Sequence, residues 1–511
     1  MTDEQFDNLI MHSLSIMCRF AKWYILQYIL LFCMPFLWND SLNIGLAISI
    51  AVYTLIFSIY REFVIPKKQI KFIYLPLFAY IIIIVLCCII GRERFPSLWL
   101  YLFLPIYGII CLITGKLLKK YYRKHESIIR RTFLIISIII VLSIFKIFSI
   151  TWACNGHGCI EGEKTEIIQR RDYLVDKLIV SAINVLNEMP SGIGEQFKGE
   201  WALYSCSMFS AALNKISILY PETKNDNIIL IDSLIQIVMS PEIREYDKAR
   251  WGEDPLHSLD GNNSHISYLS HLAWMITGYK SLSNNTKYDY LLSSLCECMN
   301  RRLLKSPALN LETYPGEPIY IPDMLVAIVA LHKYSQLYKG KYSSTVKEYL
   351  KRARELWCDK ETGLLVSFLE LNGTQIHNAP IKGSYSALNC YYLTQIDKGF
   401  ANEQYSMLKT LFWKNSLISG LKEYYKDEFY IGLDMDAGPI LFELSPTGTA
   451  FCTGSATFFN DTHTRTQILK TAEIAGHSIL YNKKRHYLLA NIALVGESIM
   501  LAMRTNYDFT E

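Results

Sequence analysis

The placement of long apolar segments is the feature that most constrains how this 511-residue chain folds. A helix that crosses a bilayer needs about 20 mostly apolar residues, because the hydrocarbon core is about 30 Å thick and a helix rises about 1.5 Å per residue. Core helices of soluble proteins rarely run this long without a charge. We therefore predict a transmembrane anchor domain over residues 1–152, with about five helices at 23–38, 42–60, 72–91, 97–115 and 132–152.

The basic residues of the short loops predict how this anchor is oriented. Alternate loops carry thirteen and two Lys or Arg residues, and the richer set includes the N-terminal flank and the loops at 61–71 and 116–131. Basic loops face the cytoplasm, so the N-terminus is expected inside and residue 153 onward outside. We expect a multi-pass protein of the inner (cytoplasmic) membrane with a periplasmic, extracytoplasmic C-terminal domain. The apolar segments contain no Asp, Glu or His, which favours an anchor over a pump.

The rest of the chain has the composition of a folded helical domain, which we place at 164–511 after a linker at 153–163. Apolar residues recur there at i, i+3 and i+4 in blocks separated by Gly, Pro, Asn and Asp. The blocks predict helices at 164–189, 200–218, 226–240, 264–281, 285–305, 322–338, 342–357, 384–396, 401–415, 446–459, 463–482 and 487–502.

These predicted helices alternate between two kinds. Those starting at 200, 264, 322, 384, 446 and 487 are apolar on nearly every side, as buried helices are, while those between them carry charge on one face. Six alternations predict an all-α fold, an (α/α)6 toroid with an inner ring of helices inside an outer ring. The first helix of the domain would close the outer ring against the last inner helix. An α-solenoid of helix pairs is the alternative.

Polar and aromatic residues concentrate just before the inner helices, where a toroid would gather the connecting loops at one end. Loops are polar anyway and carboxylates cap helix N-termini, which would explain the acids. Capping does not explain aromatic rings beside the carboxylates. Such rings are better suited to a binding cleft, where they stack on a sugar or other ring of the ligand or bury its hydrocarbon. The segment before 200 also contains Glu195 and Glu200. The predicted substrate-binding residues are Trp201, Tyr204, His265, Tyr268, Tyr314, Glu317, Tyr320, His377, Tyr385 and Glu443.

Candidate catalytic groups follow from the same loops. A carboxyl group crowded by acids and rings can act as a general acid, so the candidates are Asp260, Asp323, Asp434 and Asp436, together with His271. Hydrolysis of a glycosidic bond would need two carboxyl groups about 5–10 Å apart, and Asp323 with Asp434 or Asp436 is the expected pair.

Other chemistries find little support in the sequence. It contains no HExxH, GxSxG or phosphate-binding glycine motif, so we expect no metal and no cofactor. The net charge of +4 and the lack of a basic stripe argue against nucleic acid.

Three segments carry a resemblance to a known family: HISYLSHLAWMITGYKSLSNNTKYDYL at 265–291, TYPGEPIYIPDMLVAIVAL at 313–331 and GLDMDAGPILFELSPTGTAFCTGSA at 432–456. Together they resemble the linalool dehydratase/isomerase-like proteins, (α/α)6 toroids of which some carry N-terminal membrane helices. The resemblance implies the toroid, the position of its cleft, and roles for His271 and Asp323. The family's cleft cysteines would fall near the third inner helix, but this chain has no Cys between Cys298 and Cys358.

The combined expectation is a membrane-anchored enzyme with an acidic and aromatic cleft on the periplasmic side. It would act by general acid/base chemistry on a glycan or on an isoprenoid or lipid-like substrate, as a hydrolase, lyase or hydratase-isomerase. A non-catalytic binding or scaffold protein of the envelope is the alternative. The expected partners are the lipid bilayer and that substrate, and the sequence leaves the oligomeric state open.

Overall fold

The computed structural model describes residues 160–189, 197–415, 419–426, 432–434, 437–440, 443–476, 478–491 and 493–509. The five predicted transmembrane segments and the basic loops lie outside these residues. Within the described part of the chain, no helix combines the length and the apolar character that a membrane crossing requires.

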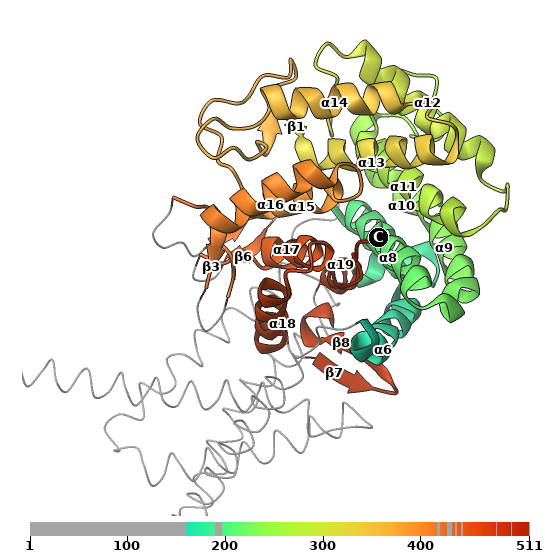
Figure 1. Ribbon diagram of the computed structural model, residues 1–511. Coiled ribbons are helices and arrows are strands. Elements are labelled where there is room, and N and C mark those ends of the chain that lie inside the picture. Colours follow the sequence, from blue (N-terminus) through green and yellow to red (C-terminus); the bar gives the residue numbers. More distant parts are fainter. Residues whose placement is uncertain are drawn as a thin grey trace, which may run out of the picture. The chain divides into compact units, whose positions relative to one another are not determined.

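Six helices of the described chain form a closed inner ring (Figure 1). Each packs against the next in sequence order, and the last packs against the first, which a solenoid would not allow. The ring therefore closes, and the solenoid alternative is wrong. The helices are α8 (Lys198–Leu219), α11 (Ile266–Leu282), α13 (Ile321–Leu337), α15 (Gly383–Leu393), α17 (Pro446–Phe458) and α19 (Leu494–Arg504).

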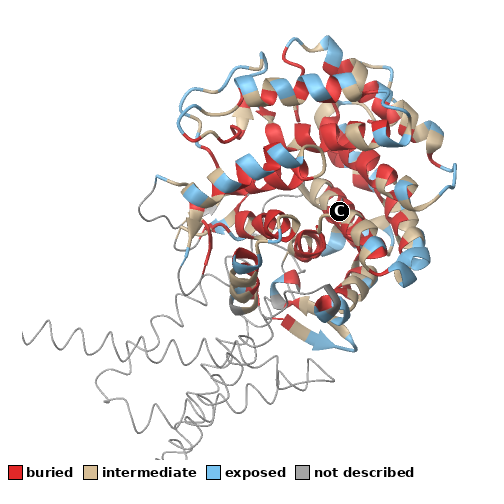
Figure 2. Cartoon of the chain, in the orientation of Figure 1, coloured by how far each residue is buried: buried red, intermediate tan, exposed pale blue. Residues whose placement is uncertain are grey.

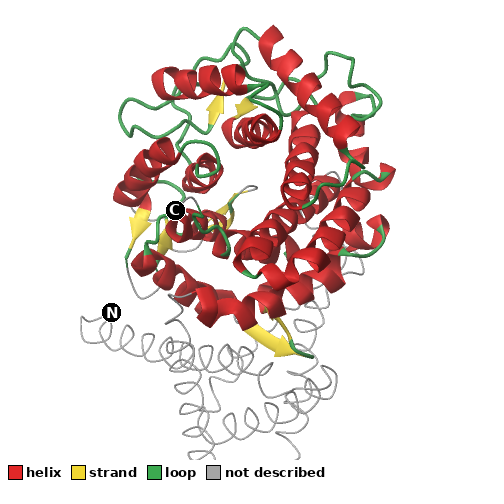
Figure 3. Cartoon of the chain, turned by 45° about the vertical axis from the view of Figure 1, so that its right-hand side comes forward, coloured by secondary structure: helices red, strands yellow, loops and turns green. Residues whose placement is uncertain are grey.

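A second set of helices surrounds this ring (Figure 3), and each of them packs against one or two inner helices. All but the first of these outer helices return the chain from one inner helix to the next, so the N-termini of the inner helices lie at the same end of the ring. This arrangement is that of an α/α toroid. The outer helices are α6 (Ile160–Leu178), α9 (Lys224–Val238), α12 (Asp289–Lys305), α14 (Ser343–Leu356), α16 (Lys398–Phe412) and α18 (Thr462–Gly476).

Burial separates the two kinds of helix as the sequence predicts (Figure 2). Inner helix α13 buries twelve of its 17 residues, on every side of the helix. Outer helix α14 buries only a stripe, Thr345, Val346, Tyr349 and Ala353. The alternation of all-round apolar and one-sided helices is thus the sequence signal for the two rings.

One helix prediction is wrong in its limits, and one helix was missed. The predicted helix at 164–189 breaks into α6 and α7 (Ala182–Glu188), because the Ser181 side chain accepts a hydrogen bond from the Asn184 amide and starts a new helix. Helix α10 (Pro241–Trp251) was not predicted, since it is polar on most sides. Its start and stop signals are nevertheless present: Ser240 caps it, and Gly252 ends it with φ of 75° in the left-handed region.

The predicted helices at 463–482 and 487–502 are wrong where they meet. Helix α18 ends at Gly476, and a hairpin of β7 (Ser478–Tyr481) and β8 (Lys484–Tyr487) follows. Its two turn residues, Asn482 and Lys483, both have positive φ, the backbone that matches the twist of a hairpin. Helix α19 therefore begins only at Leu494.

Three more two-stranded pairs lie in the connections between helices. They are β1 (Ile319–Tyr320) with β2 (Phe368–Leu369), β3 (Trp413–Lys414) with β4 (Gly420–Leu421), and β5 (Gly432–Asp434) with β6 (Gly438–Ile440). The pair β1–β2 joins the loop before α13 to the loop before α15, which brings those two loops together at one end of the ring.

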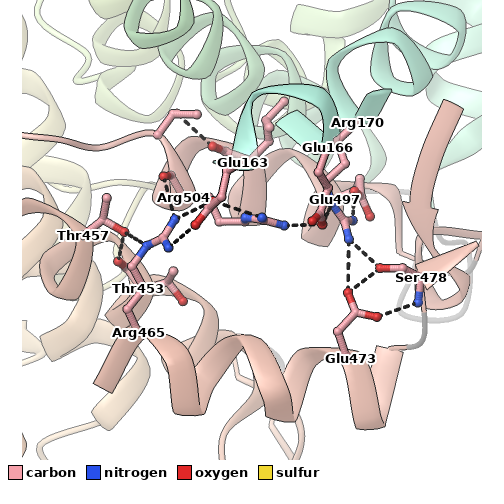
Figure 4. Close-up of polar contacts among 12 residues, drawn as sticks. Glu163, Glu166, Arg170, Thr453, Thr457, Arg465, Glu473, Ser478, Glu497 and Arg504 are labelled. Atoms are coloured by element: carbon pink, nitrogen blue, oxygen red, sulfur yellow. Dashed lines mark hydrogen bonds and ion pairs between the residues drawn. The ribbon is translucent and has the colours of Figure 1, made fainter. Parts of the chain in front are cut away.

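A buried network of charges closes the ring between α6 and the last part of the chain (Figure 4). Arg170 of α6 pairs with Glu497 of α19 at 2.7 Å and with Glu166 at 3.0 Å. Arg504, at the other end of α19, pairs with Glu163 and Glu166, and Arg465 of α18 also pairs with Glu163. These pairs hold α6 antiparallel to α19, as expected for the helix that closes the outer ring.

Candidate functional site

The N-terminal ends of α15 and α17 meet directly. An added Cβ on Gly448 of α17 would lie 3.0 Å from the Ser384 amide nitrogen of α15, and one on Gly383 would lie 2.0 Å from the Lys422 carbonyl oxygen. Glycine at both positions permits this close approach. The segment that carries Glu423 is thereby held against the ends of two inner helices.

Glu423 occupies this junction as a buried acid. Its Oε1 accepts a hydrogen bond from Ser384 Oγ at 2.7 Å, and its Oε2 accepts one from the Ser384 amide at 3.2 Å. Burial raises the pKa of Glu423 to about 7, the charge of Asp434 adds to the rise, and hydrogen bonds from Ser384 and Ser445 oppose it. Glu423 is fully buried, so its structural role is to join two helix ends.

Aromatic rings connect the start of α13 to the start of α15. The Tyr320 ring lies 6.2 Å from the Tyr385 ring and 5.1 Å from the Phe368 ring, centroid to centroid. Tyr320 and Phe368 face each other across the β1–β2 pair. All three are aromatic residues at the end of the ring where the inner helices begin, and Tyr320 and Phe368 are only half-buried.

Arg250 extends this group toward α8. Its guanidinium lies 3.9 Å from the Tyr314 ring and 5.4 Å from the Phe197 ring, and its Nη1 donates to Glu317 at 3.3 Å. The Tyr320 hydroxyl donates to the other oxygen of Glu317, also at 3.3 Å. Arg250 comes from the end of α10, the helix that sequence reasoning missed.

The ring axis is occupied by tyrosines from opposite sides. Tyr204 of α8 and Tyr392 of α15 are linked by ring contacts through α11, although α8 and α15 stand three places apart in the six-helix ring: the Tyr204 ring lies 5.0 Å from the His271 ring, and the Tyr392 ring lies 5.7 Å from the Trp274 ring. Burial raises the pKa of Tyr204, and the charges of Asp323 and Glu200 raise it further. Two carboxylates, from the first turns of α13 and α8, therefore both raise the pKa of one buried tyrosine of the inner ring.

Asp323 and Glu200 are each placed by their surroundings. Thr313 Oγ1 donates to Asp323 Oδ2 at 2.7 Å. The charge of Glu200 adds to the effect of burial in raising the pKa of Tyr314. Both acids are half-buried and reach solvent.

Lys382 joins the aromatic residues near the start of α15 to Asp434. Lys382 Nζ lies 2.9 Å from Asp434 Oδ2 and 5.2 Å from the centre of the Tyr385 ring. Asp434 also accepts hydrogen bonds from the Tyr424 hydroxyl at 3.3 Å and from the Ala437 amide at 3.0 Å. Asp434 is thus engaged by a cation and two donors, which suits a fixed anion better than a proton donor.

These contacts form one continuous group, which we call the rim cluster. Every member is linked to the next by a charge interaction, an ion pair, a hydrogen bond or a ring contact. Its members are Glu200, Tyr204, Arg250, Tyr314, Glu317, Tyr320, Asp323, Lys382, Tyr385 and Asp434. Seven of these ten residues were predicted as site residues from sequence.

His271 lies on the inner ring beside this cluster. Its Nδ1 forms a hydrogen bond with Ser207 Oγ at 2.8 Å, and its ring is 5.0 Å from the Tyr204 ring and 6.2 Å from the Trp274 ring. Burial lowers the pKa of His271 to about 3, so the imidazole is neutral at physiological pH. A neutral, hydrogen-bonded histidine in the packed ring fits a positioning role.

Other predicted site residues serve the fold. The Tyr268 hydroxyl donates to the Val238 carbonyl of outer helix α9 at 3.0 Å. His265 begins α11 with φ of 49°, and its Nδ1 hydrogen-bonds Asp247 Oδ2 at 2.5 Å. Trp201 packs against the hydrophobic core. Glu443 pairs with Lys414 at 3.2 Å.

The remaining predictions lie at the surface or outside the described residues. Asp260 and His377 are exposed, and the Asp260 carbonyl accepts a hydrogen bond from Arg301. Asp436 lies outside the described residues. Among the described residues, no group of three or more His, Cys, Asp or Glu side chains is arranged to hold a metal ion.

Sequence reasoning missed several functional candidates for identifiable reasons. Glu200 was read only as part of a polar loop, since an acid in the first turn of a helix is an ordinary cap. Arg250 belongs to a helix that was not predicted. Tyr392 lies ten residues into its helix, far in sequence from the loops that drew attention, and only ring closure brings it to Tyr204.

The fold and the rim cluster define the class of protein as an α/α toroid with an acidic and aromatic group at one end of the ring. No protein-family model and no curated protein matches this chain. Among solved structures, a glycoside hydrolase from family 105 of C. acetobutylicum ATCC 824 is similar at a TM-score of 0.41 and 10% identity. The match covers 59% of this chain and 92% of that one. A likeness at this level says nothing about activity, and the ring described above follows from the contacts of this chain alone.

Proposed function

We propose that this chain is an enzyme that acts on a glycan by general acid–base catalysis at the rim cluster. The observation that carries the proposal is that Glu200 and Asp323 lie in the first turns of two different inner helices, α8 and α13, and that the charges of both raise the pKa of Tyr204. Two carboxyl groups flanking a bond are what glycosidic cleavage requires, one as acid and the other as base or nucleophile. Asp323 has the role predicted from the sequence, and Glu200 replaces Asp434 or Asp436 as its proposed partner.

The aromatic residues supply the binding part of the proposal. The half-buried rings of Tyr320 and Phe368, with Tyr385 beside them, offer faces on which a sugar ring can stack. Lys382 and Arg250 fix Asp434 and Glu317 beside these faces. Acids beside aromatic faces are typical of carbohydrate sites.

An isoprenoid or lipid-like alcohol is the second candidate substrate. The observation in its favour is the aromatic interior below the acids, where the Trp274 ring lies 5.7 Å from the Tyr392 ring and 6.4 Å from the Tyr391 ring. The resemblance to linalool dehydratase/isomerase-like proteins points the same way. Loss or addition of water at an allylic alcohol would use the same two carboxyl groups as acid and base.

We further propose that residues 1–152 anchor this domain in the inner membrane and place it on the periplasmic side. The support is the series of apolar segments and the basic bias of alternate loops. An anchored enzyme would meet envelope glycans or membrane-dissolved alcohols without diffusing away.

The test is a substrate screen with the full chain in detergent or nanodiscs, comparing wild type with Asp323→Asn and Glu200→Gln. Each variant keeps the size of the side chain and removes its ability to exchange a proton. We expect turnover of a glycan by the wild type and a loss of about 10²–10⁴-fold in kcat for either variant. Thr313→Val, which removes the hydrogen bond to Asp323, should lose less than either.

Four outcomes separate the alternatives. Release of products from oligosaccharides supports the glycan proposal, while conversion of geraniol or linalool with no action on saccharides favours the second candidate. Retention of full activity in both Asp323→Asn and Glu200→Gln contradicts the catalytic pair. Binding without any turnover would support a non-catalytic envelope protein.

A further inference from the structure

The rim cluster carries an excess of negative charge. Among its described members, the carboxyl groups are Glu200, Glu317, Asp323 and Asp434, and the cations are Arg250 and Lys382. Both cations are already paired with acids of the same cluster, Arg250 with Glu317 at 3.3 Å and Lys382 with Asp434 at 2.9 Å. An anionic ligand would therefore meet a net repulsion and would have to compete for both cations.

Both cations also make cation–π contacts with aromatic rings. The Arg250 guanidinium stacks 3.9 Å from the Tyr314 ring, and Lys382 Nζ lies 5.2 Å from the Tyr385 ring and 5.8 Å from the Phe368 ring. A cation over a ring face gains a favourable interaction that it would lose on turning toward a ligand. Recruiting either cation for a carboxylate ligand would thus break two contacts at once.

A second, independent observation concerns Asn389 on α15. This side chain is 1% exposed, and neither its amide nitrogen nor its amide oxygen has a hydrogen-bond partner among the described residues. Tyr385, Asn389 and Tyr392 are spaced at i, i+4 and i+7, so they share one face of the helix. That face is the one from which the Tyr392 ring contacts the Trp274 ring of inner helix α11, at 5.7 Å between centroids.

An unpaired buried amide costs free energy, and proteins rarely keep one without a use. Asn389 lies one helical turn, about 6 Å, from Tyr385 at the rim. The hydroxyl of Ser386 on the same helix is likewise buried without a partner. Both side chains offer neutral donors and acceptors, which match the hydroxyl groups of a sugar and supply no charge for a carboxylate.

We propose that the rim cluster takes an uncharged, hydroxyl-rich ligand, a neutral saccharide, and discriminates against uronates, and that the amide of Asn389 hydrogen-bonds the hydroxyl groups of the innermost sugar unit. This inference rests on the proposed function for its substrate class. It specifies that the substrate is uncharged, and it names Asn389 as a residue that binds it. To reach Asn389 from the rim, the sugar pushes the Tyr385 ring aside. The sugar then stacks on the face of the moved ring.

The test is calorimetric titration of the full chain with saccharide probes of known charge. The neutral probes are the hexasaccharides of cellulose, xylan, mannan and starch, and the anionic probes are oligogalacturonate and oligoguluronate. We expect a neutral probe to bind at least about tenfold more tightly than either uronate at low salt, with the gap narrowing at about 0.5 M salt as screening weakens the repulsion. Equal or tighter binding of a uronate overturns the charge discrimination.

Asn389→Leu tests the second part, with the exposed Asn402→Leu on α16 as the matched control. Leucine has nearly the shape of asparagine, so removing an unpaired amide should leave the melting temperature unchanged or higher. The same variant should lose at least about tenfold in affinity for the neutral probe, the expected cost of hydrogen bonds to one sugar unit. A lower melting temperature with unchanged affinity would show that Asn389 is structural and overturn its assignment.

Glu317→Gln gives a test in the opposite direction. It releases Arg250 from its carboxylate partner and removes one negative charge, so uronate affinity should rise. No rise would contradict the charge argument. Binding of neutral probes without turnover would refute the enzyme while leaving this inference standing, whereas failure of every saccharide to bind would overturn both.

Discussion

Arg170→Met offers the sharpest test of how the ring is closed. The guanidinium of Arg170 is fully buried and pairs with Glu497, which is only 2% exposed, and with Glu166 and Glu473. It also donates to Ser478 Oγ and lies 4.0 Å from the Tyr487 ring. Methionine fills much of the same volume but leaves Glu497 without its nearest counter-charge.

The magnitude follows from the burial of both partners. Removing one partner of a buried ion pair costs about 3–5 kcal/mol, because the remaining charge is left desolvated and unpaired. For a domain of this size, about 2 °C of melting temperature corresponds to 1 kcal/mol, which gives a fall of about 6–10 °C. The assay is thermal unfolding followed by circular dichroism, with the full chain in detergent.

The control and the refuting result use other pairs of the same chain. Arg352→Met removes an exposed pair with Glu348 on α14 and should cost no more than about 1 kcal/mol. Arg170→Met/Glu497→Leu replaces the buried pair with apolar groups and should recover much of the loss. Burial raises the pKa of Glu497, so the deficit of Arg170→Met should shrink as the pH falls and Glu497 takes up a proton. A loss below about 1 kcal/mol, or a double variant no better than the single, would refute this account of closure.

Three further predictions concern other parts of the chain. The folded pKa of Glu423 is raised to about 7 from 4.5, so the contribution of Glu423 to stability should be fully present below pH 4.5 and be lost, by up to about 3 kcal/mol, as the pH rises through 7; Glu423→Gln should remove that contribution in denaturant titrations compared with the wild type. Tyr268→Phe should cost about 1 kcal/mol of stability and leave kcat unchanged, because its hydroxyl serves the Val238 carbonyl rather than a ligand. Cysteines introduced in the 116–131 loop should react with a membrane-impermeant thiol reagent only in opened cells, and those at exposed Tyr290 in intact spheroplasts, as the predicted topology requires.

The ring was predictable because its signal is repeated. An inner helix such as α13 is apolar on all sides and an outer helix such as α14 on one side, and six alternations leave few other architectures. Starts marked by proline were predicted to within a residue, as at Pro322 and Pro446. Helix α10 and the β7–β8 hairpin were missed because a polar helix and a two-residue turn have local signals only, and neither belongs to the repeating pattern.

The gathering of residues at the starts of the inner helices was predictable, but which of them contact one another was less so. Asp323, Tyr314 and Tyr320 precede or open an inner helix, so the gathering of helix ends brings them together. This rule does not say where a side chain points: Tyr268, in the first turn of inner helix α11, donates outward to Val238 of α9. The contact of the Tyr392 ring with the Trp274 ring joins α15 to α11, two places away in the ring, and no local sequence pattern predicts it.

The most direct test of the central claim is a double-mutant cycle on kcat, with Glu200→Gln, Asp323→Asn and the combined variant assayed on whichever substrate the wild type turns over. If the ring brings these two acids to one reacting bond, the double variant should be no slower than the slower single one, because either loss alone disables the pair. Multiplied effects of the two substitutions, or full activity in either single variant, would contradict the claim that Glu200 and Asp323 act together.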